Sequence, residues 1–295
     1  IMIVLAGIAI GVVALNNKAN GLGLVEGTRV SIGRDMGSML GDPNDLALVL
    51  LFPISFATSL VMTRGCHWSM KLLGLIAVPV LFFAIMATQS RGGLLGMLAV
   101  FGVFAYRRIK SRALFAMIAL VAATVLFTMA GISDRASGGA AEEGIDESAM
   151  GRLYAWEAAF YMALHNPVTG VGLNNFYANY FFFSQHWDGK NHAVHSTWFG
   201  VLAETGFAGL FIFIAMITML IKSARRSLEK IESSMDIPVA VHSASQAVLA
   251  GMIGVVISGS FLTQGFTWPL YILMALIVAL SYWVRAHTEK TNISS

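Results

Sequence analysis

Long blocks of apolar residues are the feature that most constrains the fold of this chain. Of its 295 residues, 57% are hydrophobic and only 12% are charged, whereas soluble domains carry roughly 25% charged residues. Apolar runs of about 18 residues or more with few charges are typical of membrane-spanning helices. Lipid offers no partner to backbone polar groups, so spanning segments satisfy their own hydrogen bonds as helices. The sequence therefore predicts an all-α, polytopic integral membrane helix bundle.

Eight apolar segments account for the expected spans. They cover residues 1–15, 46–63, 71–88, 92–106, 113–132, 197–221, 239–262 and 268–286. The sequence begins at Ile1 inside an apolar run, so we expect the end of a span there and N-terminal helices to be missing. The boundaries divide the chain into N-terminal helices (1–132), a long polar loop (133–196) and C-terminal helices with a tail (197–295).

The distribution of basic residues predicts which loops face the cytoplasm. Basic residues gather in short cytoplasmic loops of membrane proteins. One set of loops holds 12 of the 19: Arg64, Lys71, Arg107, Arg108, Lys110, Arg112, Lys222, Arg225, Arg226, Lys230, Arg285 and Lys290. These loops and the C-terminus are therefore expected inside, and the 133–196 loop is expected outside.

Within the long loop the pattern predicts one amphipathic helix. Ser148 can cap a helix that runs to about Asn166, where Pro167 ends it. Apolar side chains recur on one face: Leu153, Trp156, Phe160 and Leu164. That face is expected to lie on the membrane surface. The glycine-rich turn at 170–176 lacks the full glycine pattern of a nucleotide loop and follows no strand, so we exclude that function.

Two arginines near the outer membrane boundary could bind an anion. Arg91 lies in a tight turn, and the glycines behind it would let a substrate group approach the backbone. It could equally be an anchor for lipid headgroups. Arg152 lies near the start of the amphipathic helix, where it would hold an anion together with the positive helix end. The alternative is a solvated arginine, or one paired with Glu147 or Glu157.

Two titratable groups flank the start of the 197–221 segment. His195 can accept a proton near neutral pH, although a lone histidine at a membrane boundary is more often structural. Glu204 lies below the membrane surface, where a carboxylate is costly. On a continuous helix, Glu204 and His195 would lie on nearly opposite faces. Together with His195, the nearby His186, Asp188 and His192 could suggest a zinc site, but they lack an established zinc pattern, so no metal is expected.

Taken in order, these segments resemble the O-antigen ligase and polymerase superfamily over roughly residues 40–270. The signatures are Asp42-Pro43-Asn44-Asp45-Leu46-Ala47, Ser90-Arg91-Gly92-Gly93, Gly151-Arg152-Leu153-Tyr154-Ala155-Trp156, the turn at 166–176, and His195-Ser196 followed by Glu204-Thr205-Gly206. Asp146-Glu147-Ser148-Ala149 is similar to the exosortase-associated O-glycosylation ligases. Many relatives have His-Asn where this chain has His195-Ser196.

The resemblance implies a GT-C-like membrane glycosyltransferase in the bacterial inner membrane, with its site facing the periplasm. It would move a glycan from undecaprenyl diphosphate to a hydroxyl of a lipid, glycan or protein acceptor, with inversion and without a metal or cofactor. Arg91 and Arg152 would bind the diphosphate, and His195 would be the base. The other substrate contacts would be Arg29, Arg34 and Glu204. The alternatives are a repeat-unit polymerase and a non-enzymatic lipid or polysaccharide transporter; no nucleic acid partner is expected.

Overall fold

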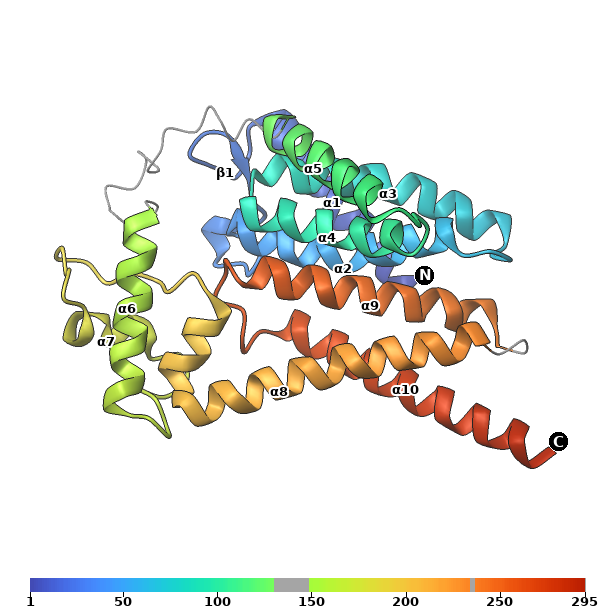
Figure 1. Ribbon diagram of the computed structural model, residues 1–295. Helices are drawn as coiled ribbons and strands as arrows, with labels where there is room; N and C mark the ends of the chain where they lie inside the picture. Colours follow the sequence, from blue (N-terminus) through green and yellow to red (C-terminus); the bar gives the residue numbers. More distant parts are fainter. Residues whose placement is uncertain (130–148, 234–236, 295) are drawn as a thin grey trace.

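The computed structural model describes residues 1–129, 149–233 and 237–294, which are mostly helical (Figure 1). In chain order the elements are α1 (Met2–Asn20), β1 (Leu24–Val25), β2 (Arg29–Val30), the 3-10 helix η1 (Arg34–Met36), α2 (Pro43–Met62), α3 (Trp68–Thr88), α4 (Arg91–Tyr106), α5 (Arg112–Met129), α6 (Ala149–His165), α7 (Phe176–Phe183), α8 (Thr197–Ser233), α9 (Val239–Gly259) and α10 (Trp268–Ser294).

Six of the described helices are long and apolar enough to cross a membrane: α1, α2, α3, α8, α9 and α10 up to His287. The helices α4 and α5 are apolar but shorter. The predicted all-α polytopic membrane bundle is thereby confirmed. The first span differs from its prediction, because α1 continues to Asn20 and is itself of spanning length.

The α2 helix is the centre of the bundle. It packs against α1, α3, α4 and α9, and most of its residues are buried. Its start is well defined, because the Asp42 carboxylate accepts the backbone N–H of Asn44 at 2.6 Å and Pro43 occupies the first helical position. Since lipid supplies no hydrophobic drive between helices, this packing depends on close van der Waals contact.

Small residues bring α4 close to α9. A Cβ atom added to Gly96 would lie 2.9 Å from the carbonyl oxygen of Gly254, and one added to Gly254 would lie 3.0 Å from that of Gly96. Glycines at such contacts let two membrane helices approach backbone to backbone. The short α4 helix is therefore fixed against the bundle, together with its first residue, Arg91.

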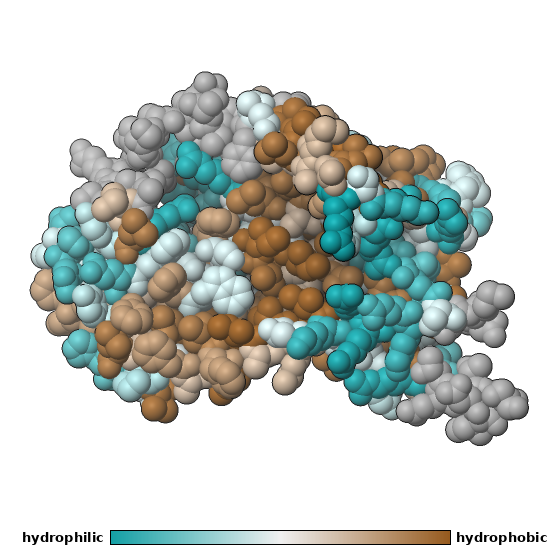
Figure 2. Space-filling model, viewed as in Figure 1, coloured by the Kyte–Doolittle hydropathy of each residue, from teal (hydrophilic) through white to brown (hydrophobic). Residues whose placement is uncertain are grey.

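The bundle has two distinct ends. In Figure 1 the bundle helices run across the view, and α6 stands across their left ends. We call this the α6 end; it comprises residues 21–42, 89–91, 149–196 and 260–267. We call the other the basic end; it comprises residues 63–67 and 107–111 and the helix ends at 222–233 and 281–287. Figure 2 shows a hydrophobic band between these ends and hydrophilic residues gathered at the basic end.

The α6 helix confirms the predicted helix in the long loop, but its packing face differs from expectation. The buried side chains are mostly alanines: Ala155, Ala158, Ala159 and Ala163, with Met162. They pack α6 against α7 and the first part of α8. Leu153, Phe160 and Leu164 are exposed, so their placement on the membrane surface remains a prediction. The predicted cap at Ser148 lies outside the described residues.

Candidate functional site

The α8 helix is broken near its start, which the sequence analysis did not predict. The predicted span at 197–221 is instead a longer element, Thr197–Ser233, interrupted at Gly206 with φ 69° and ψ −171°. A Cβ atom on Gly206 would lie 2.5 Å from the carbonyl oxygen of Pro167. That same carbonyl accepts the N–H of Phe207 at 2.8 Å. Only glycine fits this backbone conformation and this close approach.

The glycine-rich turn after α6 supports the break. The N–H of Val171 donates to the carbonyl of Ala203 at 2.9 Å, and the N–H of Gly172 donates to that of Glu204 at 3.1 Å. Gly170 has φ 61°, and its Cβ would lie 2.4 Å from the Ala203 oxygen. The turn therefore satisfies carbonyls that the broken helix leaves without partners. These two N–H groups are committed to α8, unlike the phosphate-binding N–H groups of a nucleotide loop.

Glu204 is a buried link between α8 and α7. Its side chain is 7% exposed, and its carboxylate accepts the backbone N–H of Phe176, the first residue of α7, at 3.4 Å. A carboxylate at a helix N-terminus satisfies free N–H groups and the helix dipole. Glu204 therefore has a structural role in this arrangement, and the predicted contact with substrate stays a prediction.

His195 is held in a strained conformation directly before α8. It has φ 45°, which is uncommon for a residue other than glycine. Its neighbours Val194 and Ser196 are almost fully buried, and the indole N–H of Trp156 donates to the Val194 carbonyl at 3.0 Å. His195 is half-buried and has interaction partners within the protein. Strain of this kind persists where the surroundings determine the backbone, as they do in many active sites.

The connection between α9 and α10 joins the histidine segment to α4. The Thr197 hydroxyl donates to the carbonyl of Leu262 at 2.7 Å. The preceding residue, Phe261, lies against Gly92, where an added Cβ would be 3.2 Å from the Phe261 Cβ. Consecutive residues of this connection therefore contact the segment that follows His195 and the first turn of α4.

Arg91 begins α4 and is exposed. The Ser90 hydroxyl caps the helix by accepting the N–H of Gly93 at 3.1 Å, and Gln89 ends α3 with φ 50°. Within the described residues the Arg91 guanidinium has no hydrogen-bond or ion-pair partner. We expected the glycines after Arg91 to let a substrate approach the backbone, but the structure contradicts this expectation. Both are buried, and a Cβ on Gly93 would lie 2.5 Å from that of Ala47 in α2.

Arg29 is buried and engaged by the protein. Its side chain is 5% exposed, its Nε donates to the Thr88 carbonyl at 3.2 Å, and its Nη2 donates to the Asn44 side chain at 2.8 Å. Glu26 lies 3.6 Å away as an ion-pair partner. The guanidinium therefore clamps the β1–β2 hairpin to the adjoining ends of α3 and α2.

The hairpin also contacts the turn before Arg91. The Thr28 hydroxyl donates to the Gln89 side chain at 2.9 Å. Arg34, the other predicted substrate contact in this segment, is exposed at the start of η1 and has interaction partners. The two arginines therefore differ in access to solvent, although both lie in the same connection.

Arg152 is half-buried in the first turns of α6 and has interaction partners. Glu157, one of the acids that could have paired with it, lies 3.4 Å from the His186 Nε2. The His186 ring stacks on Tyr154 with centroids 3.9 Å apart. His186 thus belongs to a surface contact on α6.

His192 and Asp188 form a histidine–aspartate pair that was not predicted from the sequence. His192 Nε2 lies 2.9 Å from the Asp188 carboxylate, and the histidine is 7% exposed against the Tyr180 ring. Desolvation raises the pKa of Asp188, but hydrogen bonds with His192 and the Lys190 N–H outweigh it and lower that pKa. The spacing of four residues was the available signal. Among the described residues no cluster of three or more His, Cys, Asp or Glu side chains could hold a metal.

The predicted residues therefore come from segments that meet at the α6 end (Figure 1). Arg91 and the segment of His195 border the same α9–α10 connection, and Trp156 of α6 joins the helix of Arg152 to Val194. The fold defines a multi-pass helical membrane protein with cationic and titratable side chains at one end.

A family model described as O-antigen ligase matches residues 75–214. The match supports an assignment to the O-antigen ligase and polymerase superfamily, whose members are glycosyl-transferring enzymes. No curated protein matches the chain. The matched region contains Arg91, Arg152, His195 and Glu204, whereas Arg29 and Arg34 precede it.

Proposed function

We propose that the protein is an O-antigen ligase-like glycosyltransferase, which moves a glycan from undecaprenyl diphosphate to an acceptor hydroxyl. We place it in the bacterial inner membrane, with the α6 end facing the periplasm. The observation that carries the proposal is His195, held with φ 45° between buried neighbours beside the connection that also contacts α4. The match of residues 75–214 to the O-antigen ligase family model suggests the reaction class.

In the proposed step the acceptor oxygen attacks the anomeric carbon of the donor sugar. A bond forms between that oxygen and carbon, while the bond from the carbon to the diphosphate oxygen breaks. The acceptor proton moves to His195, and the lipid diphosphate departs with the bonding electron pair. A diphosphate is a weak base, so a protein acid is not required. One direct displacement inverts the anomeric carbon.

The two arginines are assigned to the diphosphate. A guanidinium binds phosphate oxygens in a bidentate way and stabilises the charge that develops on the leaving group. Arg91 is exposed on the fixed first turn of α4, which suits direct contact. Arg152 would approach from α6. The exposed Arg34 is assigned to the outer part of the donor or glycan.

Two other residues are assigned positioning roles. The buried guanidinium of Arg29 holds the hairpin beside the turn that precedes Arg91. The Glu204 carboxylate holds the N-terminus of α7 beside the break in α8. Their substitution would act on the site through these contacts.

A transporter is the less favoured alternative. Transporters place ionisable groups or broken helices near the middle of the bilayer. Here the break at Gly206 lies near the α6 end of α8, and the described ionisable residues of the spans lie toward helix ends. A repeat-unit polymerase would use the same site on a different acceptor.

The test compares lipid-linked glycan in cells that lack the protein, express it, or express the His195→Gln variant at the same level. Accumulated full-length donor in the first and third strains supports a ligase. Loss of polymer length in both strains identifies a polymerase. A glycan pool that is unchanged in the absence of the protein contradicts glycosyl transfer from this donor.

A further inference from the structure

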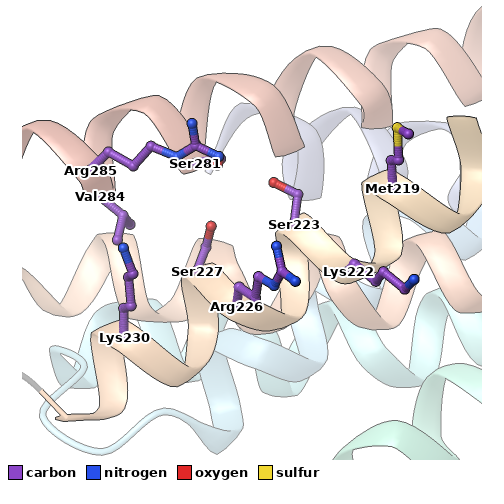
Figure 3. A pocket seen from close by; sticks show the side chains of 9 residues that line it. All are labelled: Met219, Lys222, Ser223, Arg226, Ser227, Lys230, Ser281, Val284 and Arg285. Atoms are coloured by element: carbon purple, nitrogen blue, oxygen red, sulfur yellow. The ribbon is translucent and has the colours of Figure 1, made fainter.

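A cavity of about 510 Å³ lies between α8 and α10 at the basic end, away from the candidate site. Four basic residues line it: Lys222, Arg226, Lys230 and Arg285. Figure 3 shows Ser223 and Ser227 on α8 with their hydroxyls directed toward α10. The described lining includes no acidic residue.

The spacing of the cations on α8 concentrates positive charge on one face. Lys222, Arg226 and Lys230 follow one another at intervals of four residues, so they are neighbours on the helix surface. Like charges at this spacing destabilise an isolated helix. Arg285 adds a fourth positive charge from α10, across the cavity. The arrangement therefore favours an anion between the two helices.

The described acidic residues of this part of α8 have partners outside the cavity. Glu229 forms an ion pair with Arg225 at 2.8 Å, and neither residue lines the cavity. Glu232 contacts Arg107 and lies 3.6 Å from His242. Arg226, in contrast, has no ion-pair partner among the described residues and lines the cavity. The difference between adjacent Arg225 and Arg226 provides a matched comparison.

The cavity lies where an apolar helix surface meets a basic one. Its lining includes Met219, which is 69% exposed in the apolar part of α8, and Tyr282 on α10 is similarly exposed. Such side chains face lipid in a membrane. The basic residues begin at Lys222, three residues along α8. An amphiphile with an apolar tail and an anionic head has this same division.

We propose that this cavity binds the phosphate headgroup of an anionic glycerophospholipid from the leaflet at the basic end. Arg226 and Arg285 would donate to phosphate oxygens, with Lys222 and Lys230 as further cations and the serine hydroxyls as neutral donors. The acyl chains would lie along Met219. Basic pockets between spanning helices are suited to anionic lipid headgroups. The inference is independent of the proposed transfer reaction.

The test measures phospholipid bound to the purified full chain. Wild type, Arg226→Gln and Arg225→Gln are reconstituted in phosphatidylcholine nanodiscs with increasing phosphatidylglycerol, and bound phosphatidylglycerol is measured by native mass spectrometry. Loss of one charge-assisted phosphate contact should weaken binding about tenfold in Arg226→Gln. Arg225→Gln removes the same charge from the neighbouring position and should bind like wild type. Equal loss in both variants would overturn the proposal in favour of general surface charge.

Two further arms separate the lipid from free phosphate and from misfolding. Glycerol phosphate at millimolar concentration should leave phosphatidylglycerol bound; displacement at equal affinity would mean a free-phosphate site and overturn the lipid assignment. Arg226→Lys keeps the charge at an exposed position and should retain binding within about threefold, since a lysine also binds phosphate as a point charge. If Arg226→Lys also loses tenfold while folded, the charge-based site is contradicted.

Discussion

The α6 end and the basic end both present cations at helix ends, but the backbone conformation near these cations differs. At the α6 end, two residues other than glycine have a positive φ, which is uncommon. Gln89, two residues before Arg91, has φ 50°, and His195 has φ 45°. At the basic end, Lys222, Arg226 and Lys230 are exposed side chains on the part of α8 that follows the break. The difference indicates that the backbone fixes the positions of Arg91 and His195 at the α6 end, whereas the basic end concentrates positive charge on side chains that can move.

The same contrast separates substitutions that should matter by geometry from those that should matter by charge. A residue fixed by strained backbone and buried neighbours allows few replacements. A long side chain on a helix surface can move, and another cation can replace it. Substitutions at the two ends test this contrast, as does the arrangement of the two ends across the membrane.

The largest expected difference is in labelling from outside the cell. We consider a Cys66→Ser background carrying either Gln185→Cys at the α6 end or Ser111→Cys at the basic end, both at exposed positions. The Gln185→Cys protein should react with a membrane-impermeant maleimide in intact cells, because the long loop is predicted outside. The Ser111→Cys protein should react only after the membrane is permeabilised. The reverse result would invert the topology and remove the basis for a periplasmic site.

The next effect concerns the break in α8. Gly206→Ala should destabilise the fold by at least about 1–3 kcal/mol, because alanine is strained at this φ and ψ. Its Cβ would also meet the Pro167 carbonyl at 2.5 Å. Thermal unfolding in detergent measures the change. Gly102→Ala is the matched control, since that helical glycine has space for a Cβ, with its nearest contact at 4.0 Å. Equal unfolding temperatures for the two variants would show that the break is not required.

His195→Gln should slow glycosyl transfer by a factor on the order of 10²–10⁴, the usual contribution of a general base. Donor binding should remain, because the arginines are assigned to the diphosphate. In wild type, the rate should fall as lower pH protonates the imidazole. Transfer by purified protein with lipid-linked donor, measured against pH, provides the check. A variant that keeps more than about a tenth of the rate, with an unchanged pH profile, would exclude His195 as the base. The Asp188–His192 pair would then be the next group to test.

The smallest effects compare lysine replacements at the two ends. Arg91→Lys should lower transfer by about tenfold or more, since lysine cannot reproduce a bidentate phosphate contact. Arg152→Lys should behave in the same way. Arg226→Lys should leave transfer unchanged, because that residue lies at the other end of the bundle. Full activity of Arg91→Lys and Arg152→Lys at normal protein levels would show that both arginines are general cationic anchors.

Much of the architecture could be predicted from local sequence patterns. The apolar blocks predicted the helices, and the periodic pattern predicted α6 to within a residue or two of its described bounds. Short elements were missed: the β1–β2 hairpin has two-residue strands, and α7 is an eight-residue aromatic segment. Elements of this length carry too few residues to establish a period. Their positions depend on contacts with α3 and α8 instead.

By itself, the sequence determined the class of fold, the approximate spans and the residue types available for chemistry, because burial in lipid imposes length and composition on each segment. Only the tertiary structure decided which of those residues are available. Arg29 and Arg91 cannot be distinguished by their sequence patterns. In the structure Arg29 is buried and hydrogen-bonded to Thr88 and Asn44, whereas Arg91 is exposed. Gly206 cannot be distinguished from other helical glycines in the sequence, but in the structure the Pro167 carbonyl lies close to it. In both cases the outcome depends on partners distant in the chain, which no local pattern contains.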